Sequence, residues 1–136
     1  MAYVTSAEQR RHIKEAVFDQ IAPGEAAVRC GVEMYRVRGS QVHARYCAPG
    51  SGNYKFNLNP NTLRADFELW ICGTLDHWYL IPVQVIQQMY EHPAAYRDPF
   101  HPESCALGVD PVSHRARYAR PSVTLDLTPY FAATLP

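Results

Sequence analysis

The fold is decided by residues 65–92, which read ADFELWICGTLDHWYLIPVQVIQQMYEH. Residues 65–72 are almost continuously apolar, a turn follows at residues 73–77, and a second apolar run extends over residues 78–83. Runs that are apolar on both faces are typical of strands in the middle of a sheet with cover on each side. The second strand leads directly into a segment whose apolar spacing predicts a helix over residues 83–90.

The sequence before this stretch predicts a helix, a hairpin and a short strand. Ser6 and Gln9 stand at the spacing of a capping box, which predicts a helix beginning there and ending at Pro23-Gly24. Apolar and polar residues then alternate over residues 32–47, which is typical of a β-hairpin. Residues 54–59 alternate in the same way and predict another strand, which Pro60 ends.

Together these elements predict a single α+β domain over residues 1–136. Its centre is a mixed β-sheet of about five strands, with an N-terminal helix and a second helix after the strand Trp78–Val83. We expect residues 1–92 to form the α/β core. Residues 93–136 are rich in proline, histidine and tyrosine, and we expect an irregular extension with one late strand at residues 122–127.

Composition places the chain among ordinary globular proteins. Its 136 residues, 47% of them hydrophobic, suffice for one core without a metal or disulfides. The four cysteines form no C-x-x-C pair, which indicates free thiols in a reducing compartment. No apolar run is long enough to cross a membrane, and the first residues lack the pattern of a signal peptide. We therefore expect a cytoplasmic protein with no membrane partner.

A net charge of zero hides a basic segment. Residues 29–64 carry six basic residues and one acid, a net charge of +5. A hairpin turning at Gly39-Ser40 would pair Val37 with Val42, turning the apolar residues to the core and the basic ones outward. This surface either binds an anion such as nucleic acid or only keeps the hairpin solvated. The expected nucleic-acid-binding residues are Arg36, Arg38, His43, Arg45, Lys55 and Arg64.

The order of elements resembles that of small members of the PD-(D/E)XK nuclease superfamily, particularly its homing-endonuclease-like and Holliday-junction-resolvase-like branches. The likeness extends over residues 7–90, and its most specific piece is residues 65–85. Gln41-Val-His-Ala-Arg45 stands where those proteins have a glutamine or glutamate, an apolar residue and a lysine. The resemblance implies a restriction-endonuclease-like fold with Glu33, Gln41 and His43 at the catalytic positions.

Hydrolysis of a phosphodiester by such an enzyme requires Mg²⁺ held by acidic oxygens. If the protein is active, Glu15 and Glu33 are the candidate metal ligands; otherwise we expect no cofactor. In the predicted hairpin, however, Glu33 pairs with Tyr46 on the core-facing side, opposite to Gln41 and His43. The sequence therefore predicts a nucleic-acid-binding protein whose catalysis is lost or altered.

Two alternatives stay open. A β-bulge would bring Glu33 round to the other face, which would allow an active Mg-dependent endonuclease. Otherwise the sheet merely resembles that fold, and the chain is a non-enzymatic protein-interaction or small-ligand-binding protein. The sequence does not distinguish DNA from RNA. We also expect a homo-oligomer, because the tail is rich in apolar residues suited to a subunit contact: Tyr118, Val123, Leu125, Leu127, Tyr130 and Phe131.

Overall fold

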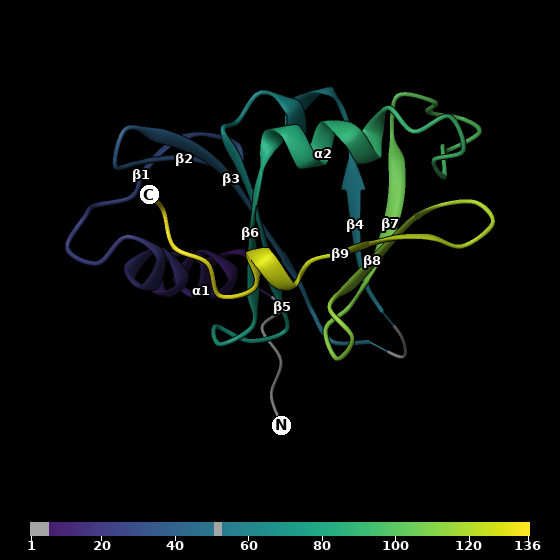
Figure 1. The fold of residues 1–136 in the computed structure, drawn as a ribbon. Coiled ribbons are helices and arrows are strands. Elements are labelled where there is room, and N and C mark those ends of the chain that lie inside the picture. Colours follow the sequence, from purple (N-terminus) through teal and green to yellow (C-terminus); the bar gives the residue numbers. More distant parts are fainter. Residues whose placement is uncertain (1–5, 51–52) are drawn as a thin grey trace.

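The computed structural model describes residues 6–50 and 53–136, which form two α-helices and two β-sheets (Figure 1). The predicted α+β class is confirmed. The first five residues, which enter the prediction about a signal peptide, and the tip of the loop expected at residues 48–53 lie outside the described part. Within that part, no helix has both the length and the apolar character needed to cross a membrane.

The first sheet contains five strands in the order β1-β2-β3-β5-β6. Strands β3 and β5 run parallel and the other neighbours antiparallel, so the mixed five-stranded sheet is confirmed. Its outermost strand β1 was not predicted. The bounds are Val28–Gly31 for β1, Met34–Val37 for β2, Ser40–Cys47 for β3, Phe67–Cys72 for β5 and Trp78–Pro82 for β6.

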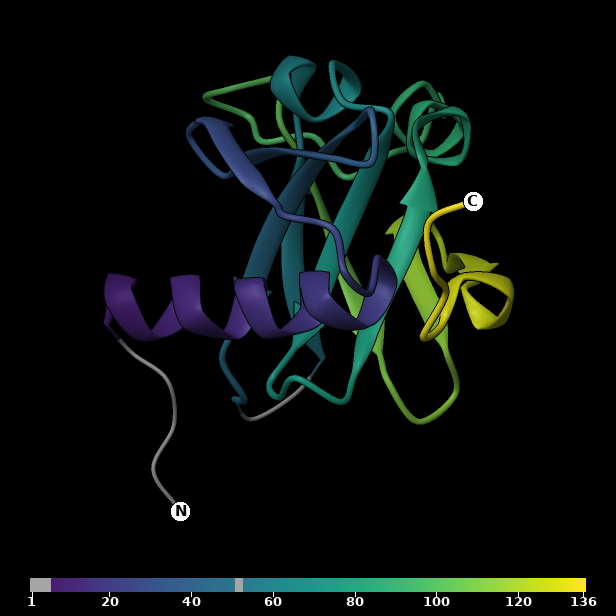
Figure 2. The same ribbon diagram turned by 90° about the vertical axis from the view of Figure 1, so that its left-hand side faces the viewer.

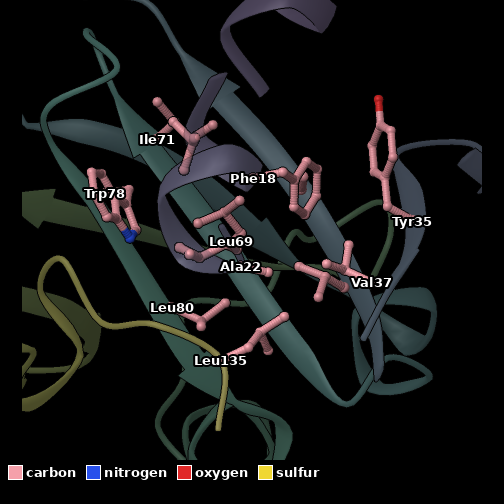
Figure 3. Packing of buried hydrophobic residues seen from close by; sticks show 13 residues of the cluster. Phe18, Ala22, Tyr35, Val37, Leu69, Ile71, Trp78, Leu80 and Leu135 are labelled. Atoms are coloured by element: carbon pink, nitrogen blue, oxygen red, sulfur yellow. The ribbon is translucent and has the colours of Figure 1, made fainter. Parts of the chain in front are cut away.

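Helix α1 (Ala7–Ile21) crosses one face of this sheet (Figure 2). It begins at the predicted capping box, where the Ser6 hydroxyl accepts a hydrogen bond from the Gln9 amide at 3.1 Å. Its buried residues include Phe18 and also the cationic Lys14. Figure 3 shows Phe18 packed with sheet residues in a first hydrophobic core, which Leu135 from the end of the chain completes.

Strands β5 and β6 separate this core from a second one. In β5, Leu69 belongs to the first core and the next residue, Trp70, belongs to the second. In β6, Leu80 belongs to the first core and the residue before it, Tyr79, belongs to the second. Both strands are therefore covered on each side, as predicted. The expected place in the middle of the sheet was wrong for β6, which lies at the edge, where its Tyr79 forms a β-bridge with Phe131.

The second sheet supplies the cover for the other face. Its order is β4-β7-β8-β9, with helix α2 (Val83–Tyr90) across one end of the space between the sheets (Figure 1). The strands are β4 (Tyr54–Leu58), β7 (Cys105–Asp110), β8 (Arg115–Ala119) and β9 (Val123–Asp126). Strand β4 was predicted, but it lies in this sheet rather than in the central one.

The expectation of an irregular extension with one strand was therefore wrong. The late strand exists as β9, but β7 and β8 precede it. In β7 the inward residues Cys105, Leu107 and Val109 alternate with outward Ala106 and Gly108. Small outward residues weaken the contrast between the two faces, which is why the period of two escaped notice.

The apolar tail is also used inside the chain. Leu127 is fully buried, and most of the other residues proposed for a subunit contact pack against the second core: Tyr118, Leu125, Tyr130 and Phe131. A short 3₁₀ helix, η2 (Thr128–Tyr130), turns the chain along β6. The four cysteines, all within the described residues, are free. Homo-oligomerisation stays a prediction that no longer draws support from these side chains.

The hairpin turns one residue earlier than expected. Arg38 and Gly39, with φ of 47° and 76°, form the turn, and Val37 faces Ser40 instead of Val42. This register differs from the predicted one by two residues on β3. Because side chains alternate with a period of two, Tyr35 and Val37 still point into the core.

We expect Gly73→Ala to destabilise the protein more than Gly39→Ala. Both glycines have positive φ, so each substitution costs about 1–2 kcal/mol of backbone strain. A Cβ at Gly73 would also lie 2.6 Å from the Tyr54 hydroxyl, whereas a Cβ at Gly39 meets open space. Urea unfolding should show a further loss of roughly 1–3 kcal/mol for Gly73→Ala. Equal losses would contradict this packing.

Candidate functional site

A cavity of about 580 Å³ opens on the hairpin face that points away from α1. We call it the basic cavity. Asn59 and Asn61 border it where the 3₁₀ helix η1 (Pro60–Leu63) begins. Most of the predicted site residues line it: Glu33, Arg36, Gln41, His43, Arg45 and Arg64. The structure therefore brings the three predicted catalytic residues together.

A buried carboxylate lies beneath this cavity. Glu68 of β5 faces His43 of β3 in the parallel ladder and is 0% exposed. Both of its carboxylate oxygens lie 3.0 Å from His43 Nδ1, and the Trp70 indole donates a hydrogen bond to Oε1 at 3.2 Å. Every partner of this carboxylate thus comes from protein side chains, which is what a group removed from water requires.

Burial raises the pKa of Glu68, and this effect outweighs the opposing influence of the His43 hydrogen bond. The contact also fixes the orientation of the His43 ring. Because Nδ1 is held by Glu68, Nε2 is the ring nitrogen turned to Glu33. Glu68 is therefore a positioning residue for His43.

Glu33 does not face the core as predicted. It has a φ of +59° in the turn between β1 and β2, which breaks the alternation on which the prediction rested. Its Oε2 lies 3.7 Å from His43 Nε2 and 3.6 Å from Arg45 Nε. The left-handed conformation of Glu33 thus turns its side chain away from the core, as a β-bulge would have done. Glu33 therefore lines the same cavity as Gln41 and His43.

Three other predicted residues lie elsewhere. Arg38 occupies the turn, where its guanidinium donates to the Leu135 carbonyl at 3.4 Å and lies 3.8 Å from Glu25. Lys55 lies on β4 in the second sheet. Glu15 pairs with Arg11 at 3.8 Å on the exposed surface of α1 and lines no cavity described here.

A second cavity, of about 780 Å³, lies between α1 and the β1–β2 turn. It shares Val32 and Glu33 with the basic cavity, so the two lie on either side of this turn. Burial lowers the pKa of Lys14, one of its cations. The two cavities together are called the basic surface. Its arginine and lysine residues are Arg10, Arg11, Lys14, Arg29, Arg36, Arg45 and Arg64.

The residues of the basic cavity do not fit the Mg²⁺ that the resemblance implies. Mg²⁺ is commonly held by one or two carboxylates together with water, but Glu33 is the one carboxylate among the described residues that line the cavity. Its Oε2 is already contacted by His43 and Arg45. Asp66 Oδ2 accepts the Gln41 amide at 2.8 Å, and Glu68 is covered by His43. In the described part of the chain, no group of three or more Asp, Glu, His or Cys side chains is arranged to hold a metal.

Glu68 is the site residue that sequence reasoning missed. A signal was present, because a glutamate inside an apolar run with both faces buried needs a buried partner. The cations that α1 contributes, Arg10, Arg11 and Lys14, were not among the predicted site residues either, because basic residues on one face of a helix are also typical of a solvated surface. Comparison with protein-family models, with curated proteins and with solved structures found no match for this chain.

We expect Glu68→Gln to preserve the fold and Glu68→Leu to damage it. Glutamine keeps an oxygen that accepts from Trp70 and His43 and removes the buried charge. Leucine leaves both donors without a partner, which costs about 1–3 kcal/mol. Thermal and urea unfolding of both variants measure the difference. If Glu68→Leu were as stable as the wild type, the buried pair would have no structural role.

The Glu68→Gln variant and the wild type should also differ in how their stability depends on pH. The pKa of Glu68 is higher in the folded than in the unfolded state, so its contribution to stability is fully present below the unfolded value of about 4.3 and is lost as the pH rises. Glutamine does not titrate. The stability of Glu68→Gln relative to the wild type should therefore increase between about pH 4 and pH 7. A difference that stays constant with pH would contradict the raised pKa.

Proposed function

We propose that this protein binds nucleic acid through the basic surface, on a restriction-endonuclease-like fold whose cleavage chemistry is lost or altered. The charge of the basic surface carries the proposal: seven arginine and lysine side chains line its two cavities, against the acids Glu8 and Glu33. The chain as a whole has a net charge of zero. Such a concentration of positive charge favours a polyanion.

The layout of the surface suits a nucleic acid better than a single small anion. Its cations come from α1, β1, the hairpin and the residue that follows η1, so they can contact several phosphates of one backbone rather than a single anion. Val32 stands 82% exposed at the turn between the two cavities, in a position to contact bases. The side-chain amides of Gln41 and Asn61 can both donate to and accept from base edges.

The nuclease-like part of the proposal is supported by the order of elements and by the convergence of Glu33, Gln41 and His43. Altered cleavage follows from the surroundings of His43, which stands at the lysine position. Its two ring nitrogens lie 3.0 Å and 3.7 Å from carboxylates. An imidazole held between two carboxylates does not stabilise the charge that develops on a phosphate as a free lysine does.

We expect Arg36→Gln combined with Arg64→Gln to weaken binding to a labelled duplex by roughly tenfold at about 50 mM salt. Both residues line the basic cavity and both are exposed, so the fold should survive. The plot of log affinity against log salt should also become shallower by about 1 for each lost phosphate contact. Fluorescence anisotropy measures both quantities.

Arg38→Gln is the matched control, because Arg38 is an exposed arginine of the same hairpin that contacts Glu25 and Leu135 instead. It should bind within about twofold of the wild type. Equal effects of Arg36→Gln and Arg38→Gln would mean that net charge, not this surface, attracts the ligand. A wild-type protein that binds neither duplex nor single strand at low salt would favour the protein-interaction or small-ligand alternative.

Active cleavage is a second candidate function, favoured by the distance of 3.7 Å between Glu33 and His43. Because the cavity does not fit Mg²⁺, we expect the wild type not to nick supercoiled plasmid with either Mg²⁺ or Mn²⁺. Nicking that Glu33→Gln abolishes and Glu25→Gln leaves intact would establish the nuclease instead. Glu25 is a suitable control because it is an exposed acid that lies outside both cavities.

A further inference from the structure

The outer face of the second sheet carries a trough with a glycine floor. Lys55 of β4 lies opposite Gly108 of β7, and Gly108 lies opposite Arg117 of β8. Neighbouring strands are about 4.8 Å apart, so the two cationic side chains rise about 10 Å from each other with no side chain between them. The cavity along this row has a volume of about 640 Å³.

Amides and an aromatic ring form the walls of this trough. Asn53 and Asn57 flank Lys55 along β4, and Tyr96 stands on the opposite side. The Tyr96 hydroxyl accepts a hydrogen bond from Arg117 Nε at 3.1 Å. The backbone of Tyr96 is held by hydrogen bonds to the neighbouring strands. Its N–H donates to the Tyr118 carbonyl at 3.2 Å, and its carbonyl accepts from the Ala106 N–H at 2.9 Å. The ring is therefore held in place rather than free to collapse.

The chemistry of these groups defines a ligand. Two cations and no acid line the trough in the described part of the chain, which selects an anion. The Tyr96 ring, over which the Arg117 and Arg120 guanidinium groups lie at 5.9 Å from its centroid, offers a planar surface where a base and these cations can stack together. The two asparagines offer both donors and acceptors. A positive groove with an aromatic platform and amides is how proteins bind nucleic acid whose bases are unpaired.

We infer that this trough binds single-stranded nucleic acid, with phosphates at Lys55 and Arg117 and a base against Tyr96. A duplex is excluded as the occupant because its bases are stacked on one another and leave no free face for the tyrosine. The inference rests on the proposed function in the choice of nucleic acid as the ligand, but the site is a separate one.

The trough and the basic cavity meet at β4. Arg45, which lines the basic cavity, donates a hydrogen bond from Nη1 to the carbonyl of Asn57 at 2.7 Å, and the Asn57 residue lines the trough. Two residues further along the chain, Asn59 lines the basic cavity again. A single-stranded nucleic acid that extends from the basic cavity across β4 therefore reaches the trough directly.

The test is the affinity for an oligonucleotide of about 12 thymidines, within the range of site sizes of single-strand-binding folds. Lys55→Gln combined with Gly108→Asp should weaken this affinity roughly tenfold at about 50 mM salt. Duplex affinity should change by less than about twofold, because the duplex uses the basic surface. A Cβ at Gly108 meets only Asn53, at 3.4 Å or more, so the variant should fold. If the double variant does not fold, Lys55→Gln alone serves as the test, because Lys55 is exposed.

Arg115→Gln is the matched control. Arg115 points to the same face of β8 as Arg117, but it lies opposite Asp110 on one side and Asp126 on the other. Its loss should leave thymidine binding unchanged. An unaltered single-strand affinity in the trough variants would overturn the inference.

The two proposals fail separately. If Arg36→Gln with Arg64→Gln weakens duplex binding while the trough variants change nothing, the proposed function stands and the trough does not. If only the trough variants lose affinity, and only for the single strand, the trough stands and the basic surface does not.

Discussion

A carboxylate buried in a strand that has no solvent-exposed face is the constraint on which this structure depends. Strand β5 contributes Leu69 and Ile71 to one core and Trp70 and Cys72 to the other, so any polar side chain on it must find its partner inside the protein. Glu68 finds His43 because β3 and β5 pair in parallel with these residues in register. The candidate site therefore lies at His43, because β5 is buried between the two cores and β3 supplies the partner that the buried Glu68 requires.

The fold was predictable wherever the apolar pattern was strong. Residues 65–92 gave the correct order of strand, turn, strand and helix, and the capping box placed the start of α1. The second sheet was not foreseen, because β7 and β8 have small or charged outward residues and lie within a segment rich in proline and histidine. A short strand with weak alternation is recognised only when its partner strand is known.

The candidate site was predicted in its members but not in its geometry. Gln41 and His43 share a face because alternation holds along β3. Glu33 escaped that rule through one positive φ, and Arg38 left the predicted surface by entering the turn. Left-handed residues that are not glycine leave little trace in a sequence, since their conformation is imposed by the neighbouring strands. Glu68 had a signal, but its partner depended on the register of a parallel pair.

The attachment of the chain end to α1 affects the order in which the protein can fold. The Leu135 amide donates to the carbonyl of Ile21, and the Leu135 side chain fills the first core beside residues of α1. A ribosome releases α1 and the hairpin long before this residue emerges. Until then one side of the first sheet stays partly uncovered, and its closure requires a contact between the two ends of the chain. Folding of the first core is in this sense completed only after the segment around Leu135 has been synthesised.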